Sequence, residues 1–476
     1  MKWATGELDL MENEAQLANF LFESEYRGIS IDPRFLMVKS VELIREQLKL
    51  RGKIAEVAAA CGLVEFNPGS PQQVKKFYEG QCEFTPLAWG KPDKKGQVNS
   101  SWGKDALEQM NLIEHGATKF GAAPVELAKL IMELNSVDTN KSSFCDGWLG
   151  NVDDNDIIHA NFKQHGTKTS RLSCTEPNAQ NFPPWVLEAM LIPKGYVGVK
   201  WDKSQIEYRM FAHYANNPAI NAIYAKDPAS DFHQLRADML GFPRKPIKPI
   251  NFGIIYGMGE AKTKRSIFGV MSEIDSPKFR KSMARYSGGI VVPEYGTAIE
   301  QRLGVAVASN VLKEYHATMP EIKELFRSCK EALQSRGWVK NFFGRRYFIP
   351  VSKSYIGLNA IIQGGAADLF KQVLVELHMV RCKYALSVCN IHDCDMSIMK
   401  IEDAQNYVNE VKDIVASAPF IIPVLVDFEV ALGRWSTLTK VKDAKDIKAT
   451  FTKLDHVLNR LVPRNYKKEY SSDLTA

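Results

Sequence analysis

The sequence predicts an α+β fold in which a small sheet lies among many helices. Apolar residues three and four positions apart, the helical period, run through most of the 476 residues. Alternating apolar residues, the strand period, are confined to short segments, chiefly 195–202, 387–399 and 423–430. Helices therefore dominate the expected fold, and the strands are few.

Helical patterns fill the N-terminal part of the chain. They run from residue 12 to about residue 60, with a turn and a short extended piece at 27–32. After a loop, Ser70-Pro71 can start another helix, because proline suits the first helical turn. Residues 80–104 are rich in Gly, Lys and Pro, so we expect a long flexible loop there.

The rest of the chain combines strands with helices. Asp202 closes the first strand, and a helix is expected directly after it, followed by more helices from 217 to about 335. The stretch "GWVKNFFGRRYFIP" reads as a hairpin around Phe343-Gly344. A long helix at 357–380 precedes the second strand segment, and an amphipathic helix at 446–462 ends the fold.

Composition sets wide limits on function. The chain is 45% hydrophobic and 24% charged, which is ordinary for a globular protein with a large core and more than one domain or subdomain. A formal net charge of +6 permits a polyanionic partner without requiring one.

The cysteines and the chain start indicate the compartment. Eight scattered cysteines without CxxC pairs are typical of a reducing environment. Zinc at Cys389, His392 and Cys394 is disfavoured, because no second ligand pair follows. The acidic start lacks the apolar segment of a signal peptide, and no run approaches a membrane span, so we expect a cytoplasmic protein without membrane contact.

Two acids are the first candidates for chemistry. Asp202 ends one strand and Asp393 lies in the middle of another. Two carboxylates on adjacent strands repel unless cations bridge them, as in a two-metal centre, and oxygen-only ligands favour Mg²⁺. The alternative is that each acid caps a helix or turns a hairpin, and Asp202 before a helix is a fair N-cap.

A second set recurs every four residues in "RKPIKPINFGIIYGMG". Arg244, Lys248, Phe252 and Tyr256 would share one face of a continuous helix. Two cations followed by two aromatic rings suit a ligand with a polyphosphate at one end and a flat ring at the other. The aromatic spacing alone also fits core packing.

These motifs, in this order, resemble the family A DNA polymerases, the group of bacterial DNA polymerase I and podophage replicative polymerases. The match runs nearly end to end. The stretch "TKTSRLSCTEPNAQNFP" is similar to the primer-template segment, "DKSQIEYR" to motif A, "RKPIKPINFGIIYG" to motif B and "IHDCD" to motif C. The hairpin stretch and "NAIIQGGAADLFK" are similar to the palm, and "VEFNPGSPQQVKKF" to the thumb.

The resemblance implies a right-hand polymerase architecture with a small antiparallel palm sheet, helical fingers and a helical thumb. The domains it implies are an N-terminal segment and thumb at 1–145, palm at 146–215, fingers at 216–334, palm again at 335–436 and a C-terminal extension at 437–476. The activity it implies is template-directed addition of dNTPs to a primer 3′-hydroxyl, with primer-template DNA as the partner.

The resemblance also implies a role for each site residue. Asp202 and Asp393 would bind two Mg²⁺ ions and would be the catalytic residues. Arg244, Lys248 and His233 would hold the phosphates of the nucleotide. Phe252 would contact its sugar, and Tyr256 would lie near the templating position. Glu207 would exclude a ribose 2′-hydroxyl, and Gln205 would also contact the nucleotide. DNA contacts would come from Arg171, Asn178, Gln180, Asn359, Gln363 and His392. Minor-groove donors can test pair geometry without reading sequence; the alternative for Asn359 and Gln363 is a solvated pair on a helix.

The chain departs from the family pattern at several positions. Lys203 stands where a Tyr is usual, and Cys394 replaces the usual Glu after Asp393, while Asp395 should face the other way on a strand. Prolines on both sides of Lys248 predict that the helix begins near Pro249, leaving Lys248 just outside it.

A fourth departure lies further along, where Tyr355 takes the place of the usual Arg. The DNA contact of that Arg would be lost, or replaced by Lys353 or Arg346.

The resemblance leaves some segments open. Too few residues precede the thumb-like region for a 3′–5′ exonuclease domain, so proofreading would come from a separate polypeptide, and the setting would be a bacterial or phage-infected cell. Loop 80–104 could track phosphates through Lys91, Lys94, Lys95 and Lys104, dock a processivity partner, or be a solvated loop. The apolar stripe Ile447, Phe451, Leu454, Leu458 and Leu461 could pack on the body or bind a partner helix.

Two other functions compete with this one. A single-subunit RNA polymerase is disfavoured by Glu207 together with Phe252. A catalytically silent DNA-binding protein of the same fold is disfavoured by the intact pair Asp202 and Asp393, although Cys394 keeps it open.

Overall fold

The computed structural model describes residues 1–84, 90, 98–110, 120–240, 244–258 and 309–461. Within it the chain divides into two units. A sheet unit combines residues 1–31 with residues from 153 onward, and a helical-pair unit comprises 32–152. The first 31 residues therefore group with the sheet unit, and the expected N-terminal segment and thumb at 1–145 stays a prediction. Most of the lysines expected in loop 80–104 lie outside the described residues.

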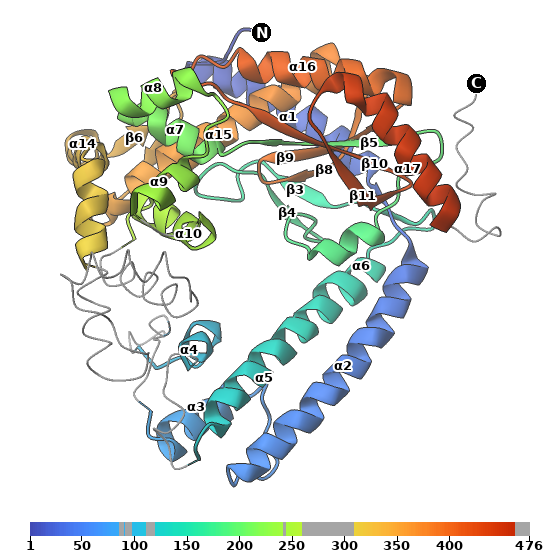
Figure 1. The fold of residues 1–476 in the computed structure, drawn as a ribbon, viewed down its shortest axis with the longest axis vertical. Helices are drawn as coiled ribbons and strands as arrows, with labels where there is room; N and C mark the ends of the chain where they lie inside the picture. The colour runs from blue at the N-terminus through green and yellow to red at the C-terminus, as the bar shows by residue number, and fades with distance from the viewer. Residues whose placement is uncertain (85–89, 91–97, 111–119, 241–243, 259–308, 462–476) are drawn as a thin grey trace. The chain divides into compact units, whose positions relative to one another are not determined.

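A five-stranded antiparallel sheet is the centre of the sheet unit (Figure 1). Its strand order is β11-β10-β5-β9-β8, so the strand of motif A lies between the strand that begins with the last residues of motif C and a C-terminal strand. The strands are β5 (Val197–Lys203), β8 (Leu386–Ile391), β9 (Cys394–Met399), β10 (Val426–Leu432) and β11 (Arg434–Val441). Val197, Val199 and Trp201 are buried, which explains the alternation seen in the sequence.

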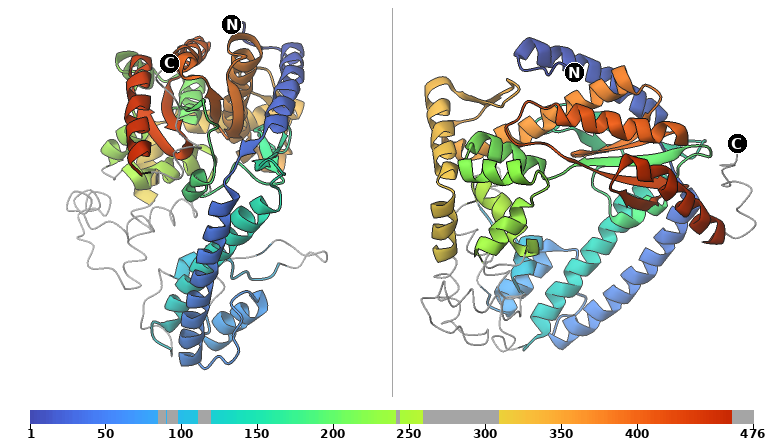
Figure 2. Two further views of the ribbon diagram at one scale, coloured as in Figure 1. Left: turned by 90° about the vertical axis from the view of Figure 1, so that its right-hand side faces the viewer. Right: turned by 45° about the horizontal axis from the view of Figure 1, so that its top comes forward.

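Helices cover this sheet and fix its position. The long α15 (Gly357–Val375) is buried along almost its whole length, and α1 (Glu7–Arg27) lies alongside it and against β8 (Figure 2). A buried ion-pair cluster joins the two helices, because Glu14 on α1 accepts from Lys371 Nζ on α15 at 2.8 Å. Helix α16 (Ala404–Ala416) contacts β10.

The C-terminal helix packs on the sheet rather than standing free. Helix α17 (Ile447–Leu461) contacts β10 and β11. Ile447 and Phe451 are fully buried, so the first part of the predicted apolar stripe faces the body of the protein.

A second group of helices follows motif A. It comprises α7 (Ile206–Ala215), α8 (Pro218–Lys226), α9 (Phe232–Leu240), α10 (Arg244–Ile255) and α14 (Glu321–Arg336). The expected hairpin is confirmed as β6 (Trp338–Lys340) paired with β7 (Arg346–Phe348). Two further two-stranded sheets pair β1 (Ile29–Ser30) with β2 (Ile157–Ile158), and β3 (Asn161–Lys163) with β4 (Ser173–Thr175).

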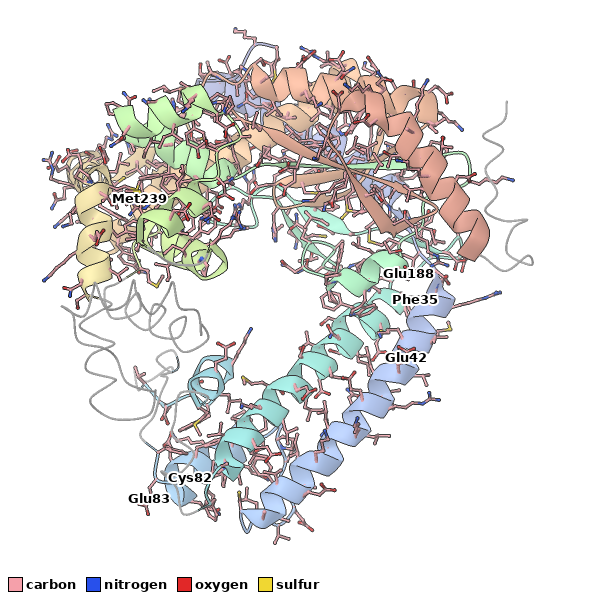
Figure 3. All side chains as sticks on the ribbon, in the orientation of Figure 1. Phe35, Glu42, Cys82, Glu83, Glu188 and Met239 are labelled. Atoms are coloured by element: carbon pink, nitrogen blue, oxygen red, sulfur yellow. The ribbon has the colours of Figure 1, made fainter. Side chains whose placement is uncertain are left out.

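The helical-pair unit is built on two long helices, α2 (Pro33–Ala60) and α5 (Ala123–Thr139), which pack against each other. Helix α2 begins where Asp32 accepts from the backbone N–H of Phe35 at 3.1 Å, with a proline in the first turn. Figure 3 marks Phe35 and Glu42 along this helix. The smaller helices are α3 (Pro71–Lys75), α4 (Lys104–Gln109) and α6 (Gly147–Leu149), and α3 is capped by Ser70 as predicted.

Two sequence expectations are wrong in the structure. Helix α10 begins at Arg244 and holds Pro249 inside it, so Lys248 lies within the helix. Asp393 lies in the turn between β8 and β9 rather than in the middle of a strand. Among the described residues, no helix is both long and apolar enough to cross a membrane.

Candidate active site

The end of β5 and the β8–β9 turn bring the two candidate catalytic acids together. In the β5–β9 register, Asp202 lies opposite Cys394, the residue directly after Asp393. The turn needs a left-handed residue, and His392 adopts it with φ +55°. Sheet pairing therefore places motif A beside motif C, as the sequence predicted, but through a hairpin turn.

The pKa of the Asp202 carboxyl group is raised beside Asp393. Desolvation at the end of β5 and the nearby Asp393 carboxylate raise the pKa of Asp202 to about 6. The ammonium groups of Lys203 and Lys200 oppose this rise. A raised carboxyl pKa beside a second acid indicates a site where added positive charge would be favourable.

Asp393 faces two cations of the chain itself. Its Oδ2 accepts from Arg171 Nη2 at 3.2 Å, and its Oδ1 lies 3.8 Å from Lys203 Nζ. Oδ1 is buried and has no hydrogen-bond partner among the described residues. A buried carboxylate oxygen without a donor is an open ligand position, and oxygen ligands suit Mg²⁺, so the residues present fit such an ion.

Glu207 connects the three polymerase-like motifs. Its carboxylate forms an ion pair with Arg171 and accepts a hydrogen bond from the Tyr256 hydroxyl. Burial raises the pKa of Glu207, and the Arg171 charge opposes that rise. Arg171 thus contacts the carboxylates of both Glu207 and Asp393.

The aromatic half of motif B forms a stack. The rings of Phe252 and Tyr256 are 5.7 Å apart with an interplanar angle of 24°. Phe252 also lies 5.2 Å from the rings of Tyr208 and His233. The inner face of α10 is apolar, because Ile247, Ile250 and Ile254 are buried.

The cationic half of motif B is exposed. Arg244 and Lys248 both reach solvent on α10. The Arg244 guanidinium donates to Asp231 at 2.5 Å, so a phosphate would have to compete with that carboxylate. The four-residue spacing, rather than the prolines, gave the correct placement of Lys248 within the helix.

His233 lies in the protein interior rather than at the surface. The side chain is fully buried, its Nδ1 is 3.3 Å from Asn251 Nδ2, and burial lowers the pKa of His233 to about 4. In this conformation the ring has no exposed surface to offer a phosphate, so the implied nucleotide contact stays a prediction.

The predicted DNA contacts divide into exposed and buried groups. Gln180 is buried and donates to the Asn390 carbonyl at 2.9 Å, so in this structure its amide supports the sheet. Asn178 is exposed, and its side-chain oxygen accepts from the Gln180 N–H at 2.9 Å. His392 Nε2 lies 3.1 Å from the side-chain oxygen of Asn181, a residue the sequence analysis missed.

Two further predicted DNA contacts and one predicted nucleotide contact are neither fully exposed nor fully buried. Asn359 and Gln363 are partly exposed on α15, and Asn359 Oδ1 lacks a hydrogen-bond partner among the described residues. Gln205 precedes α7 in the left-handed region with φ +52°. Its side-chain oxygen is likewise buried and unpartnered within the described part of the chain.

A buried polar network behind the site was missed by sequence reasoning. Asp395 is fully buried, and accepts from Ser387 and Ser397 hydroxyls at 2.6 Å each and from Tyr407 at 2.9 Å. Burial alone would raise the pKa of Asp395, but His378 at 3.3 Å and the two serine hydroxyls lower it. The alternation that turns Asp395 away from Asp393 predicted its direction, but nothing in the sequence marked its partners.

Comparison with known proteins identifies the family. The family model described as DNA polymerase family A matches residues 35–287 and 261–437. The chain belongs to DNA polymerase family A. It is accordingly a DNA-directed DNA polymerase, a nucleotidyltransferase, and the α+β fold expected from the sequence is confirmed.

Relatives of this family A polymerase come from phages and bacteria. It is 28% identical over 484 aligned residues to DNA polymerase DpoZ of Acinetobacter phage SH-Ab 15497, which covers 92% of this chain and 72% of that protein. It is 27% identical to DNA polymerase I of Rhizobium leguminosarum over 87% of this chain and 37% of that protein. This chain thus spans little more than a third of that bacterial relative.

A solved structure shares the fold. The POL domain of Pol1 from M. smegmatis, in complex with DNA primer-template and dNTP, matches with a TM-score of 0.69 and 20% identity. The match covers 89% of this chain and 70% of that one.

Proposed function

We propose that this polymerase extends a DNA primer with dNTPs, using Asp202 and Asp393 to hold two Mg²⁺ ions. The observation that supports the pair most directly is the buried, unpartnered Oδ1 of Asp393 beside the raised pKa of Asp202. When bound, such ions make the primer 3′-hydroxyl a better nucleophile and neutralise the leaving pyrophosphate.

Arg171 would exchange its contacts when the polymerase binds DNA. In the free protein its guanidinium contacts Glu207 and Asp393. We propose that the minor groove of primer-template DNA draws Arg171 away, because base edges there offer hydrogen-bond acceptors to a donor. That movement would release Asp393 and Glu207 together.

The nucleotide would lie along the exposed face of α10. Lys248 and Arg244 supply positive charge for the triphosphate, and the Phe252–Tyr256 stack supplies an apolar surface for the sugar and base. We propose that Glu207, held by Tyr256, excludes a ribose 2′-hydroxyl and so selects deoxynucleotides. Asn359, Gln363, Asn178 and His392 remain our candidates for contacts with the duplex.

The first test is primer extension by the full chain on a primed template with Mg²⁺. We expect extension with dNTPs and not with rNTPs, and we expect Asp202→Ala and Asp393→Ala to abolish it. Asp413→Asn, which changes an exposed acid on α16, serves as the control and should extend normally. Normal extension by either alanine variant would refute the assignment of the metal ligands.

We also propose that these 476 residues carry polymerase activity alone. The family match from residue 35 to residue 437 supports this, because it occupies most of the chain. A primer with a labelled 3′ end should stay intact when incubated with the protein and Mg²⁺ without dNTPs. Release of the label by the wild type and by Asp393→Ala alike would contradict the proposal, because a nuclease site apart from the polymerase acids would survive that change.

A further inference from the structure

The side chain of Lys203 places an ammonium group in the protein interior. Its side chain has no exposed surface, and Nζ finds no hydrogen-bond partner among the described residues. Nζ lies 4.0 Å from the centroid of the Phe370 ring on α15. A charge removed from water costs several kcal/mol unless an opposite charge lies nearby, so this ammonium group needs a partner.

The nearest carboxylate partner of Lys203 is Asp393. Nζ lies 3.8 Å from Asp393 Oδ1, an oxygen that is itself buried and without a hydrogen bond in the described structure. The distance is that of an ion pair and is too long for a hydrogen bond. The other oxygen of Asp393 is taken by Arg171, so each oxygen faces one cation.

Strand geometry holds Lys203 in this position. Consecutive residues of β5 point to opposite faces, so Lys203 lies on the opposite face of the strand from Asp202. Phe370 on the buried helix α15 covers the Lys203 side. The ammonium group therefore cannot swing into solvent when a metal ion approaches.

We propose that Lys203 is a fixed counter-ion of Asp393 that competes with divalent metal for the catalytic carboxylates. This rests on the proposed function, in which Asp202 and Asp393 hold the metal. Without metal, the ammonium offsets the repulsion between the two acids and holds Asp393 in place. With metal, the same charge repels the incoming cation and lowers the affinity of the free enzyme for it.

Metal binding by the free enzyme tests this directly. Mn²⁺ would be titrated into the full chain, without DNA or nucleotide, while free Mn²⁺ is followed by electron paramagnetic resonance. Lys203→Met and Lys203→Gln should both bind Mn²⁺ roughly tenfold more tightly than the wild type, since both remove one charge close to the metal ligands. The two replacements differ in polarity, so a shared effect reports the lost charge.

Lys371→Met is the matched control. Lys371 is also buried on α15, but its ammonium group pairs with Glu14 at 2.8 Å. We expect unchanged Mn²⁺ affinity in this variant, even if its folded state is less stable. A second reading is the melting temperature in EDTA and in Mn²⁺, because a tighter site gives a larger stabilisation by metal. The difference between the melting temperatures in Mn²⁺ and in EDTA should be larger in both Lys203 variants than in the wild type.

The outcomes separate the two proposals. Wild-type or weaker Mn²⁺ affinity in both Lys203 variants would overturn the counter-ion role. Unchanged Mn²⁺ binding in Asp202→Ala and Asp393→Ala would instead overturn the proposed metal site, whatever the Lys203 variants do.

Discussion

At the residue scale, the site depends on a few side chains that hold one another. Glu207 is held at both carboxylate oxygens, one by Arg171 and the other by Tyr256. Those contacts fix the carboxylate, and a fixed group can exclude a substrate oxygen that a mobile one would tolerate.

Replacing Glu207 by Ala should relax sugar selection. We expect the ratio of kcat/KM for a dNTP to that for the matching rNTP to fall about ten- to a hundredfold, the usual effect of removing one steric and polar contact. Steady-state single-nucleotide incorporation measures this ratio. Glu429→Ala, which removes a half-buried carboxylate paired with Lys200 on the same sheet, should leave the ratio unchanged. An unchanged ratio in Glu207→Ala would assign selection to another residue.

His233 predicts a pH dependence of stability. Its folded pKa of about 4 lies below the unfolded value of about 6.5, so the folded state binds fewer protons. The contribution of the neutral ring is complete above pH 6.5 and is lost as the pH falls towards 4. The free energy of unfolding should therefore drop by about 3 kcal/mol more in the wild type than in His233→Gln between pH 7 and pH 4.

Urea denaturation at each pH measures that difference. His165→Gln, which changes an exposed histidine, should follow the wild-type curve. Parallel curves for the wild type and His233→Gln would show that the ring titrates normally and is not buried as described.

At the element scale, the β8–β9 hairpin positions Asp393 through a fully buried carboxylate, that of Asp395. Asp395 accepts hydrogen bonds from both strands and from α16, which ties the hairpin to the body of the sheet unit. The hairpin therefore has a fixed register, and Asp393 has a fixed place at its turn.

Asp395→Asn should destabilise the protein by about 3 kcal/mol, because it leaves His378 and three hydroxyl donors around a neutral amide. The urea midpoint measures the loss, with Asp413→Asn as an exposed control within about 0.5 kcal/mol of the wild type. A loss below about 1 kcal/mol would mean that the network does not hold the hairpin.

Elements were predicted from the sequence more reliably than the partners of single side chains. Period and proline signals located α2, α3, the β6–β7 hairpin and α15, because each depends on local sequence. The burial of Gln180 and His233 could not be predicted from the local sequence, because it depends on tertiary contacts. Gln180 contacts Asn390, and His233 contacts Tyr208 and Phe252. Helix α10 was misjudged because isolated propensity gave too much weight to Pro249, while packing of its isoleucines maintains the helix.

At the scale of the whole molecule, the N-terminal helix α1 belongs to the sheet unit. Glu14 on α1 pairs with Arg345 beside the β6–β7 hairpin and with Lys371 on α15. One carboxylate therefore joins the start of the chain to two segments more than three hundred residues away.

Glu14→Gln should lower the free energy of unfolding of the sheet unit by about 3 kcal/mol, because the buried Lys371 loses its charge partner and the partly buried Arg345 keeps only Asp368. Glu12→Gln, an exposed acid on the same helix, should change it by less than about 0.5 kcal/mol. Thermal denaturation of both variants beside the wild type gives the comparison. Equal melting temperatures would show that the ion pairs of Glu14 do not stabilise this unit.

The central claim is that Asp202 and Asp393 carry out nucleotidyl transfer. The most direct test is single-turnover incorporation of one dNTP by Asp393→Asn, with primer-template affinity measured in parallel. The account predicts a rate at least about a thousandfold below the wild type, equivalent to roughly 4 kcal/mol in the barrier, with DNA affinity unchanged. A rate within tenfold of the wild type, at equal DNA affinity, would contradict it.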